Sequence, residues 1–228
     1  MNRAVGVIRM QLRDKWLWIY MPWLILALSF AINFAIRFFA RGEVEIYTGA
    51  LSSLYGFIFV NGIMTITQWF SFSIGLSVRR IDFFKGTTSL AVFLCALYSV
   101  ILYVLALAEE STSGWGVQMH FFSIPWFSDG TEIERIWVLF SLMLHLYFLG
   151  LIFACWHRRF GRNALFFLIV FLALALTVVA YLFTYYEIWE EAWEWIRSMS
   201  AAGLFGWLAI PTVLYAFFSY LLIRRATA

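Results

Sequence analysis

The sequence predicts an all-α, polytopic membrane protein with six transmembrane helices. Hydrophobic residues make up 64% of the chain and charged residues only 13%, whereas soluble domains have about 45–50% apolar and about 25% charged residues. The apolar residues also form uninterrupted runs that are long enough, as helices, to cross the roughly 30 Å hydrocarbon core of a bilayer. With 228 residues, the chain has room for several spans and little else.

The first predicted element is a short helix over residues 2–16 that lies on a membrane surface. At helical spacing, Val5 and Leu12 fall on one side of this helix, with Arg9 and Arg13 beside them. A helix with an apolar face and flanking arginines binds anionic membrane surfaces. We therefore expect an N-terminal interfacial helix that leads into the first span.

Six apolar segments follow, and each is long enough to span a bilayer. The predicted spans cover residues 19–40, 50–76, 88–108, 136–156, 164–185 and 202–223. Proline has no N–H, and its ring clashes with the carbonyl four residues earlier. Pro22 is therefore expected to bend the chain before the first span, and Pro211 to bend the last one. Together these helices make a single transmembrane domain over residues 1–228.

A short amphipathic helix is predicted from Tyr185 to Arg197, directly before the last span. Its four acidic residues share one narrow arc, while tryptophan, isoleucine and alanine fill the rest. The acidic residues are Glu187, Glu190, Glu191 and Glu194. Tryptophans at headgroup level with carboxylates in water are typical of an outer membrane interface. An acidic patch that gathers a ligand is the alternative interpretation.

The distribution of charge predicts the orientation of the chain. With six spans, both termini lie on one side of the membrane, and that side holds twelve of the 16 basic residues and two of the 13 acidic ones. The basic residues on that side are Arg3, Arg9, Arg13, Lys15, Arg79, Arg80, Lys85, Arg158, Arg159, Arg162, Arg224 and Arg225. Because Lys and Arg concentrate in cytoplasmic loops, we expect both termini to be cytoplasmic.

Motifs for catalysis are absent from the sequence. It contains no GxxxxGK[ST] segment for binding a nucleotide and no HExxH segment for zinc. His145 lies within a predicted span, where we expect a neutral imidazole bonded to a neighbouring helix; a functional site is the alternative. Glu109 and Glu110 are interpreted as solvated loop residues, and Cys95 and Cys155 as buried thiols rather than a disulfide.

A mild polar face runs along the second predicted span. Asn61, Thr65 and Gln68 follow helical spacing and therefore share one side. These side chains are candidates to line a pathway, or they bond to neighbouring helices. The sequence leaves both interpretations open.

The loop over residues 77–86, between the second and third spans, combines charges with consecutive phenylalanines. Arg79, Arg80, Asp82, Phe83 and Phe84 lie together between two uncharged runs. Most loops that only connect two spans are loosely polar. The pattern is typical of a surface that docks on a partner, and ordinary positive-inside arginines are the alternative.

The segment GLSVRRIDFFKGT, from Gly75 to Thr87, resembles the corresponding loop of type-2 permeases, the membrane subunits of one class of ATP-binding-cassette exporters. The N-terminal helix and the amphipathic helix before the last span are also similar in position to elements of that family. In these permeases the loop forms a coupling helix that docks on a separate ATPase subunit. The resemblance implies that docking role for Arg79, Arg80, Asp82, Phe83 and Phe84.

The resemblance also implies a function and partners. The chain would be the permease subunit of an ATP-driven exporter for an amphipathic drug, peptide or lipid, in a bacterial cytoplasmic membrane. It would not be an enzyme itself and would bind no cofactor, because ATP and Mg would bind the partner ATPase subunit. Its other partners would be membrane lipid and a second permease copy or a sister permease, with no nucleic acid. The alternative is a membrane interaction or assembly protein that transports nothing.

Overall fold

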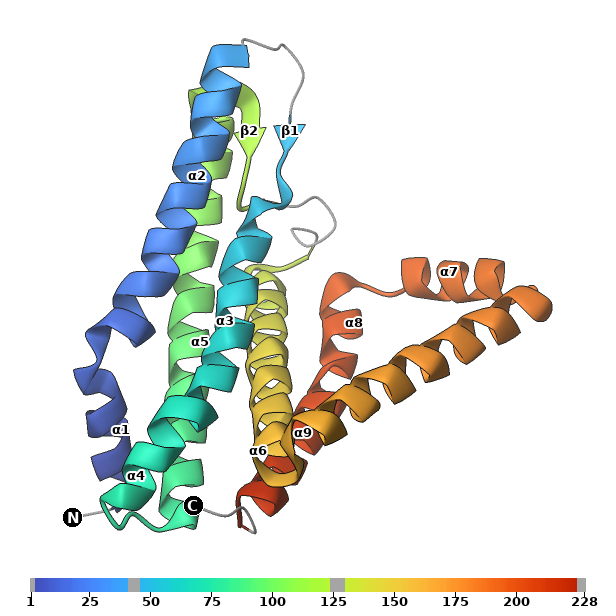
Figure 1. Ribbon diagram of the computed structural model, residues 1–228. Coiled ribbons are helices and arrows are strands. Elements are labelled where there is room, and N and C mark those ends of the chain that lie inside the picture. The colour runs from blue at the N-terminus through green and yellow to red at the C-terminus, as the bar shows by residue number, and fades with distance from the viewer. Residues whose placement is uncertain (1–2, 41–45, 124–129, 225–228) are drawn as a thin grey trace.

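The computed structural model describes residues 3–40, 46–123 and 130–224, and this part of the chain is all-α apart from one two-stranded sheet (Figure 1). Within these described residues, five helical segments are long and apolar enough to cross a membrane. They are Trp16–Ala40, Gly49–Gly75, Arg80–Ser111, Glu132–Tyr185 and Ala201–Arg224. The prediction of a helical protein with membrane-length apolar helices is thus confirmed. Asn2, Arg41, Glu43, Glu45, Pro125, Asp129 and Arg225 lie outside the described residues.

Helix α1 (Arg3–Arg13) lies against the start of α5 (Arg80–Ser111). Val7 and Gln11 are its buried residues, and the Gln11 side-chain amide donates a hydrogen bond to the Thr87 hydroxyl at 2.9 Å. Val5, which the sequence placed on the apolar face, is 38% exposed. The predicted helix is therefore present; Val7 and Gln11 hold it against α5, and Val5 lies on a side that the rest of the protein does not cover.

The first membrane-length helix begins with a π-helical turn. This turn (η1, Trp16–Tyr20) leads directly into α2 (Met21–Ala40), as Figure 1 shows. Because Pro22 has no N–H, the carbonyl of Trp18 lacks the donor that an α-helix would supply. The hydroxyl of Tyr98 on α5 donates to that carbonyl instead. The predicted irregularity at Pro22 is thus present, and the hydrogen bond that it makes possible joins this helix to α5.

The second membrane-length helix is divided into four segments. A 3-10 turn (η2, Gly49–Leu51) precedes α3 (Ser52–Met64), and a π-helical stretch (η3, Thr65–Phe70) leads into α4 (Ser71–Gly75). Side chains beyond a π-helical stretch are rotated relative to an ideal α-helix, because its turns contain more residues. This rotation decides where the polar residues of the segment point.

Two glycines bring α3 and α6 (Glu132–Tyr185) into close contact. A Cβ atom on Gly62 would overlap the carbonyl oxygen of Tyr147, and one on Gly150 would overlap that of Phe59. Small residues allow membrane helices to approach until their backbones touch. The core beside this contact joins α3, α5 and α6, and it includes the buried rings of Phe70, Phe83 and Tyr147.

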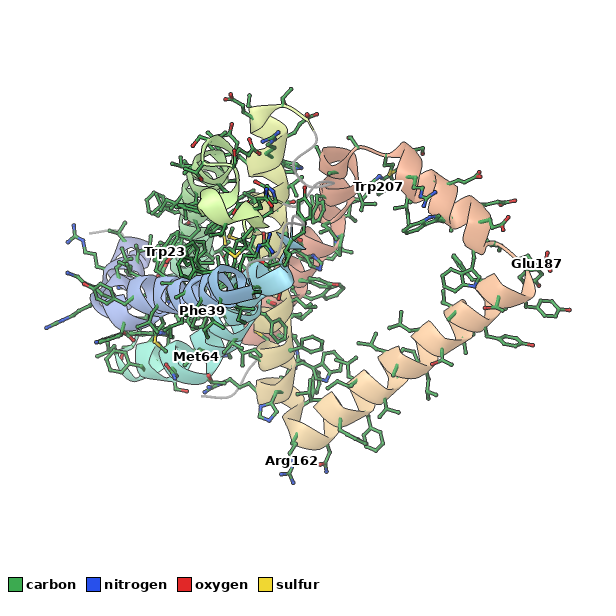
Figure 2. All side chains as sticks on the ribbon, turned by 90° about the horizontal axis from the view of Figure 1, so that it is seen from above. Trp23, Phe39, Met64, Arg162, Glu187 and Trp207 are labelled. Atoms are coloured by element: carbon green, nitrogen blue, oxygen red, sulfur yellow. The ribbon has the colours of Figure 1, made fainter. Side chains whose placement is uncertain are left out.

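Helix α6 reverses direction part-way along its 54 residues. A straight helix of this length would extend for about 80 Å, more than twice the thickness of a bilayer core. Gly161 interrupts it with φ 83° and ψ 178°, a conformation available essentially to glycine alone. Its second half, from Arg162, extends away from the bundle in both views, and Figure 1 shows that it rises as it does so (Figures 1 and 2). The predicted fourth and fifth spans are therefore two arms of one kinked element.

The chain returns to the bundle through three helices. Helix α7 (Trp189–Ser198) corresponds to the predicted amphipathic helix, and α8 (Ala201–Trp207) and α9 (Ala209–Arg224) correspond to the last span. Helix α8 ends four residues before Pro211, as expected from the clash of a proline ring with the preceding turn. No described residue from 157 to 200 is fully buried, and most of this stretch is exposed because it stands away from the rest of the bundle (Figure 2).

The far end of the bundle is closed by short irregular elements. Strands β1 (Ile46–Tyr47) and β2 (Met119–His120) pair in parallel, and a further turn, η4 (Gly114–Gln118), connects α5 to β2. Arg37 on α2 donates from Nε to the carbonyl of Val117 at 2.7 Å. These contacts fasten α2 to the segment that follows α5.

Candidate functional site

The predicted coupling segment is a tight turn between α4 and α5. Helix α4 ends at Gly75, Ser77 has a left-handed backbone with φ 59°, and Arg79 is extended (φ −67°, ψ 138°). Helix α5 begins at Arg80 and continues without a break to Ser111. Most of the expected loop over residues 77–86 is therefore the first part of the third membrane-length helix.

The exposed face of this turn is basic and apolar. Arg79 and Lys85 are exposed, and Ile81 is 44% exposed. Asp82 is half-buried in the first turn of α5, where a carboxylate stabilises the positive end of the helix dipole. Arg80, also half-buried, donates from Nη1 to the carbonyl of Arg224 at 2.9 Å, which fastens the start of α5 to the end of α9.

The two phenylalanines of the predicted docking surface point into the protein. Phe83 is completely buried, with its ring centroid 5.3 Å from that of Phe70. Phe84 is half-buried beside the ring of Tyr220, at the same centroid distance of 5.3 Å. The prediction that Phe83 offers a surface anchor is wrong. An aromatic residue next to charges is not necessarily exposed, because one helical turn presents opposite faces to the core and to the surroundings.

A continuous set of contacts joins this turn to α6. The Arg158 guanidinium lies over the Phe70 ring, 4.8 Å from its centroid, and Nη1 of Arg158 donates to the Ser71 hydroxyl at 2.8 Å. Phe70 in turn packs on Phe83. Three chain segments, η3, α5 and α6, are thus linked through aromatic and cation–π contacts.

The three polar residues of the second predicted span do not share a face in the structure. Asn61 and Thr65 are buried, and the Thr65 hydroxyl lies 3.0 Å from the hydroxyl of Tyr147 on α6. Gln68 is exposed on another side, because the π-helical stretch η3 rotates it away from the other two. Helical spacing alone was misleading here, since it assumes an uninterrupted α-helix.

His145 makes the kind of contact that the sequence analysis expected. Its Nδ1 lies 3.0 Å from the hydroxyl of Thr212 on α9, and that hydroxyl also donates to the carbonyl of Leu208 at 2.6 Å. A hydrogen bond between His145 and Thr212 therefore joins α6 to α9 in otherwise apolar surroundings.

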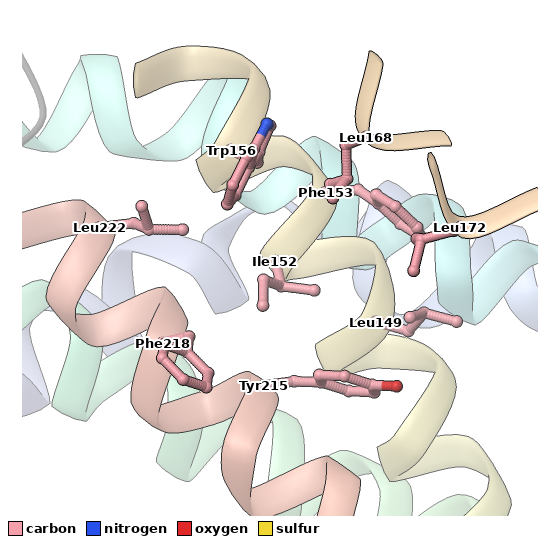
Figure 3. Close-up of a pocket in the computed structure, with 9 residues that line it drawn as sticks. All are labelled: Leu149, Ile152, Phe153, Trp156, Leu168, Leu172, Tyr215, Phe218 and Leu222. Carbon is pink, nitrogen blue, oxygen red and sulfur yellow. The ribbon is translucent and has the colours of Figure 1, made fainter. Parts of the chain in front are cut away.

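An apolar cavity of about 340 Å³ lies between the two arms of α6 and helix α9 (Figure 3). It is lined by Leu149, Ile152, Phe153, Trp156, Leu168, Leu172, Tyr215, Phe218 and Leu222. Its volume is within the range of about 300–1,000 Å³ found for small-molecule sites. A cavity with this lining accommodates an acyl chain or an aromatic group and contains little to orient a charge.

A buried carboxylate, which nothing in the sequence indicates, lies at the opposite end of the bundle. Glu109 is fully buried, and its carboxylate accepts the backbone N–H groups of Phe121, Phe122 and Ser123 at 2.8–3.0 Å. It also accepts the indole N–H of Trp115 at 3.0 Å. The expectation that Glu109 is solvated is wrong, whereas Glu110 forms a surface ion pair with Arg135. No local sequence signal separates two adjacent glutamates whose side chains point in opposite directions.

Comparisons with known proteins leave the family of this chain open. No protein-family model, no curated protein and no solved structure matches it. Within residues 3–40, 46–123 and 130–224, no group of three or more His, Cys, Asp or Glu side chains lies close enough to hold a metal ion. The resemblance of Gly75–Thr87 to type-2 permeases therefore stays a prediction.

Proposed function

We propose that this chain is the transmembrane permease subunit of an ATP-driven exporter, with ATP hydrolysed by a separate subunit. The observation that carries the proposal is the α4–α5 turn, where exposed Arg79, Ile81 and Lys85 begin a continuous helix of 32 residues. A partner that binds this turn acts directly on the third span, because no flexible loop separates the two.

The contacts behind the turn support a mechanism for transmitting movement. A displacement of α5 at its start presses Phe83 against Phe70. Phe70 in turn contacts the guanidinium of Arg158 on α6, so the displacement reaches that helix. Packed side chains transmit such displacements because protein interiors compress little. Closure of ATPase subunits on the turn thereby moves the second, third and fourth spans together. In this proposal the exposed Arg79, Ile81 and Lys85 replace the buried Phe83 as the binding surface.

The proposed topology has six spans, since Gly161 divides α6 into two arms that each cross the membrane. Both termini and the α4–α5 turn then face the cytoplasm, in agreement with the concentration of Lys and Arg on that side. The apolar cavity between the two arms and α9 supports an amphipathic substrate rather than an ion or a sugar. The assembly contains two permease chains and two ATPase subunits.

The proposal is tested by purifying the chain from its native membranes in mild detergent. A P-loop ATPase subunit is expected to co-purify with the unmodified chain. The amount that co-purifies with the double variant Arg79→Ala/Ile81→Ala is expected to be lower by a factor of about ten or more. Arg162→Ala removes another exposed arginine and is the matched control. Undiminished ATPase retention by the double variant, or uphill transport by vesicles that contain this chain alone, would refute the proposal.

One observation favours the second candidate, a membrane interaction or assembly protein without transport activity. Asn61 and Thr65 are both buried, and the Thr65 hydroxyl lies 3.0 Å from that of Tyr147 on α6, so Thr65 packs against a neighbouring helix instead of lining a pathway. The two candidates are separated by reconstituting the chain with its ATPase subunit and measuring ATP-dependent efflux of an amphipathic dye. Efflux supports the exporter, and ATPase binding without efflux supports the interaction protein.

A further inference from the structure

A groove with a cationic side and an aromatic side separates α1 from α4. It has a volume of about 710 Å³, within the range of about 300–1,000 Å³ that small-molecule sites occupy. The residues that determine its chemistry are Arg9, Arg13, Asp14, Trp69, Phe72 and Leu76. Helices α1 and α4 lie at the same end of the bundle, beside the α4–α5 turn (Figure 1).

The cationic side is formed by Arg9 and Arg13, which are one helical turn apart and both exposed. In the described part of the chain, neither guanidinium lies within ion-pair distance of an acidic side chain. Asp14 also lines the groove, but its carboxylate accepts the backbone N–H of Leu17 at 3.4 Å. Two cations against one anion leave the groove with a net positive charge and with free planar donors that suit a phosphate.

The opposite side consists of aromatic and aliphatic groups. The rings of Trp69 and Phe72 meet edge to face, with centroids 6.2 Å apart. Phe72 is 54% exposed and Leu76 is 57% exposed, so apolar surface continues out of the groove. A second hollow of about 330 Å³ adjoins it, since Asp14, Trp69 and Phe72 line both, and it extends toward Gln68.

We propose that this groove binds one anionic phospholipid, with its phosphate on Arg9 and Arg13 and an acyl chain along Trp69, Phe72 and Leu76. A soluble anion would use only the arginines, and an apolar ligand only the rings, whereas a phospholipid satisfies both sides. The lipid holds α1 against α4 and thereby stabilises the position of the adjacent α4–α5 turn. The proposal requires the long apolar helices to lie in a membrane and does not depend on the docking of an ATPase.

Binding is measured by native mass spectrometry of the whole chain in detergent, titrated with dioleoylphosphatidylglycerol or dioleoylphosphatidylcholine. We expect Arg9→Gln/Arg13→Gln to bind the anionic lipid about 25-fold more weakly, because each cation at an anionic surface contributes about fivefold. Arg3→Gln/Lys15→Gln removes the same charge from positions outside the groove and is expected to bind within about twofold of the unmodified chain.

Two further arms identify the ligand. Glycerol 3-phosphate is expected to compete poorly with the intact lipid, because it lacks the chain that contacts the rings, and Phe72→Ala is expected to weaken lipid binding severalfold. Arg9→Lys/Arg13→Lys preserves the charge of the groove. Lipid binding by this variant that lies between that of the unmodified chain and that of Arg9→Gln/Arg13→Gln supports bidentate contacts from the guanidinium groups to the phosphate. Equal losses in both double Gln variants, equal binding of the two lipids, or unchanged lipid binding by Arg9→Gln/Arg13→Gln would overturn the proposal, whatever amount of ATPase subunit the variants retain.

Discussion

The carboxylate of Glu109 accepts a hydrogen bond from the backbone N–H of Ser123 at 2.9 Å, although the two residues are 14 positions apart. The same side chain also accepts N–H groups from Trp115, Phe121 and Phe122. One carboxylate therefore organises the segment that follows α5, because it accepts the backbone N–H groups directly after β2.

Replacing Glu109 by Gln should destabilise this end of the molecule. The amide keeps the shape of the side chain but presents an NH₂ group to at least one buried donor, and an unsatisfied buried polar group costs about 1–3 kcal/mol. Thermal unfolding in detergent should shift to lower temperature, with faster amide hydrogen exchange over residues 114–123. Glu110→Gln removes only a surface ion pair with Arg135 and should change stability by less than about 1 kcal/mol. Equal stability of the two variants would contradict the role of Glu109.

Replacing Gly62 by Ala should separate α3 from α6. The added methyl group would overlap the carbonyl oxygen of Tyr147, and such overpacking typically costs about 1–3 kcal/mol. Gly56 lies on the same helix, but a Cβ there has no neighbour within 4 Å, so Gly56→Ala should be neutral or slightly stabilising. Chemical unfolding in detergent compares the two. A stable Gly62→Ala protein would mean that the helices do not touch at this point.

Replacing Gly161 by Ala should disturb the angle between the two arms of α6. The backbone of Gly161, with φ 83° and ψ 178°, is strained by about 1–3 kcal/mol for a residue with a Cβ. Spin labels at the exposed positions Phe39 and Leu176 should therefore report a shifted or broader distance distribution. Gly206→Ala, at a helical site with open space, is the control. An unchanged distribution in Gly161→Ala would show that the arm does not depend on this backbone conformation.

Replacing Phe83 by Ala should affect stability before it affects partner binding. Phe83 is completely buried against Phe70, and truncation of a buried phenylalanine costs about 3–5 kcal/mol. Lys85→Ala, at an exposed position two residues later, should change stability by no more than about 0.5 kcal/mol. Unfolding curves of the two variants distinguish the roles. A stable Phe83→Ala protein that no longer retains its ATPase would restore the interpretation of Phe83 as a surface anchor.

The membrane-length helices could be predicted from the sequence because their signal is additive along many residues. The observed Gly49–Gly75 and Ala201–Arg224 differ from the predicted spans 50–76 and 202–223 by a single position at each end. The third helix begins at Arg80 instead of residue 88. Hydropathy indicates which part of a helix is apolar enough to lie in lipid, but not how far the helix extends past that apolar part.

The details of the candidate site could not be predicted from the sequence, because they depend on tertiary contacts. The charged neighbours of Phe83 predict an exposed side chain, whereas its contact with Phe70 from another segment places it in the interior. Helical spacing puts Gln68 on the same side as Thr65 only in a regular α-helix, and the π-helical stretch η3 interrupts that regularity. His145 was placed correctly because any neutral imidazole in a span needs a hydrogen-bond partner.

The contact between Tyr98 and the carbonyl of Trp18 makes two distant positions interdependent. Pro22 leaves the carbonyl of Trp18 without a backbone donor, and the hydroxyl of Tyr98 on α5 donates to this carbonyl instead. A chain with alanine at position 22 would close its own helical bond and would tolerate phenylalanine at position 98. Among homologous sequences, the two positions should therefore covary, and the double variant Pro22→Ala/Tyr98→Phe should be more stable than Tyr98→Phe alone.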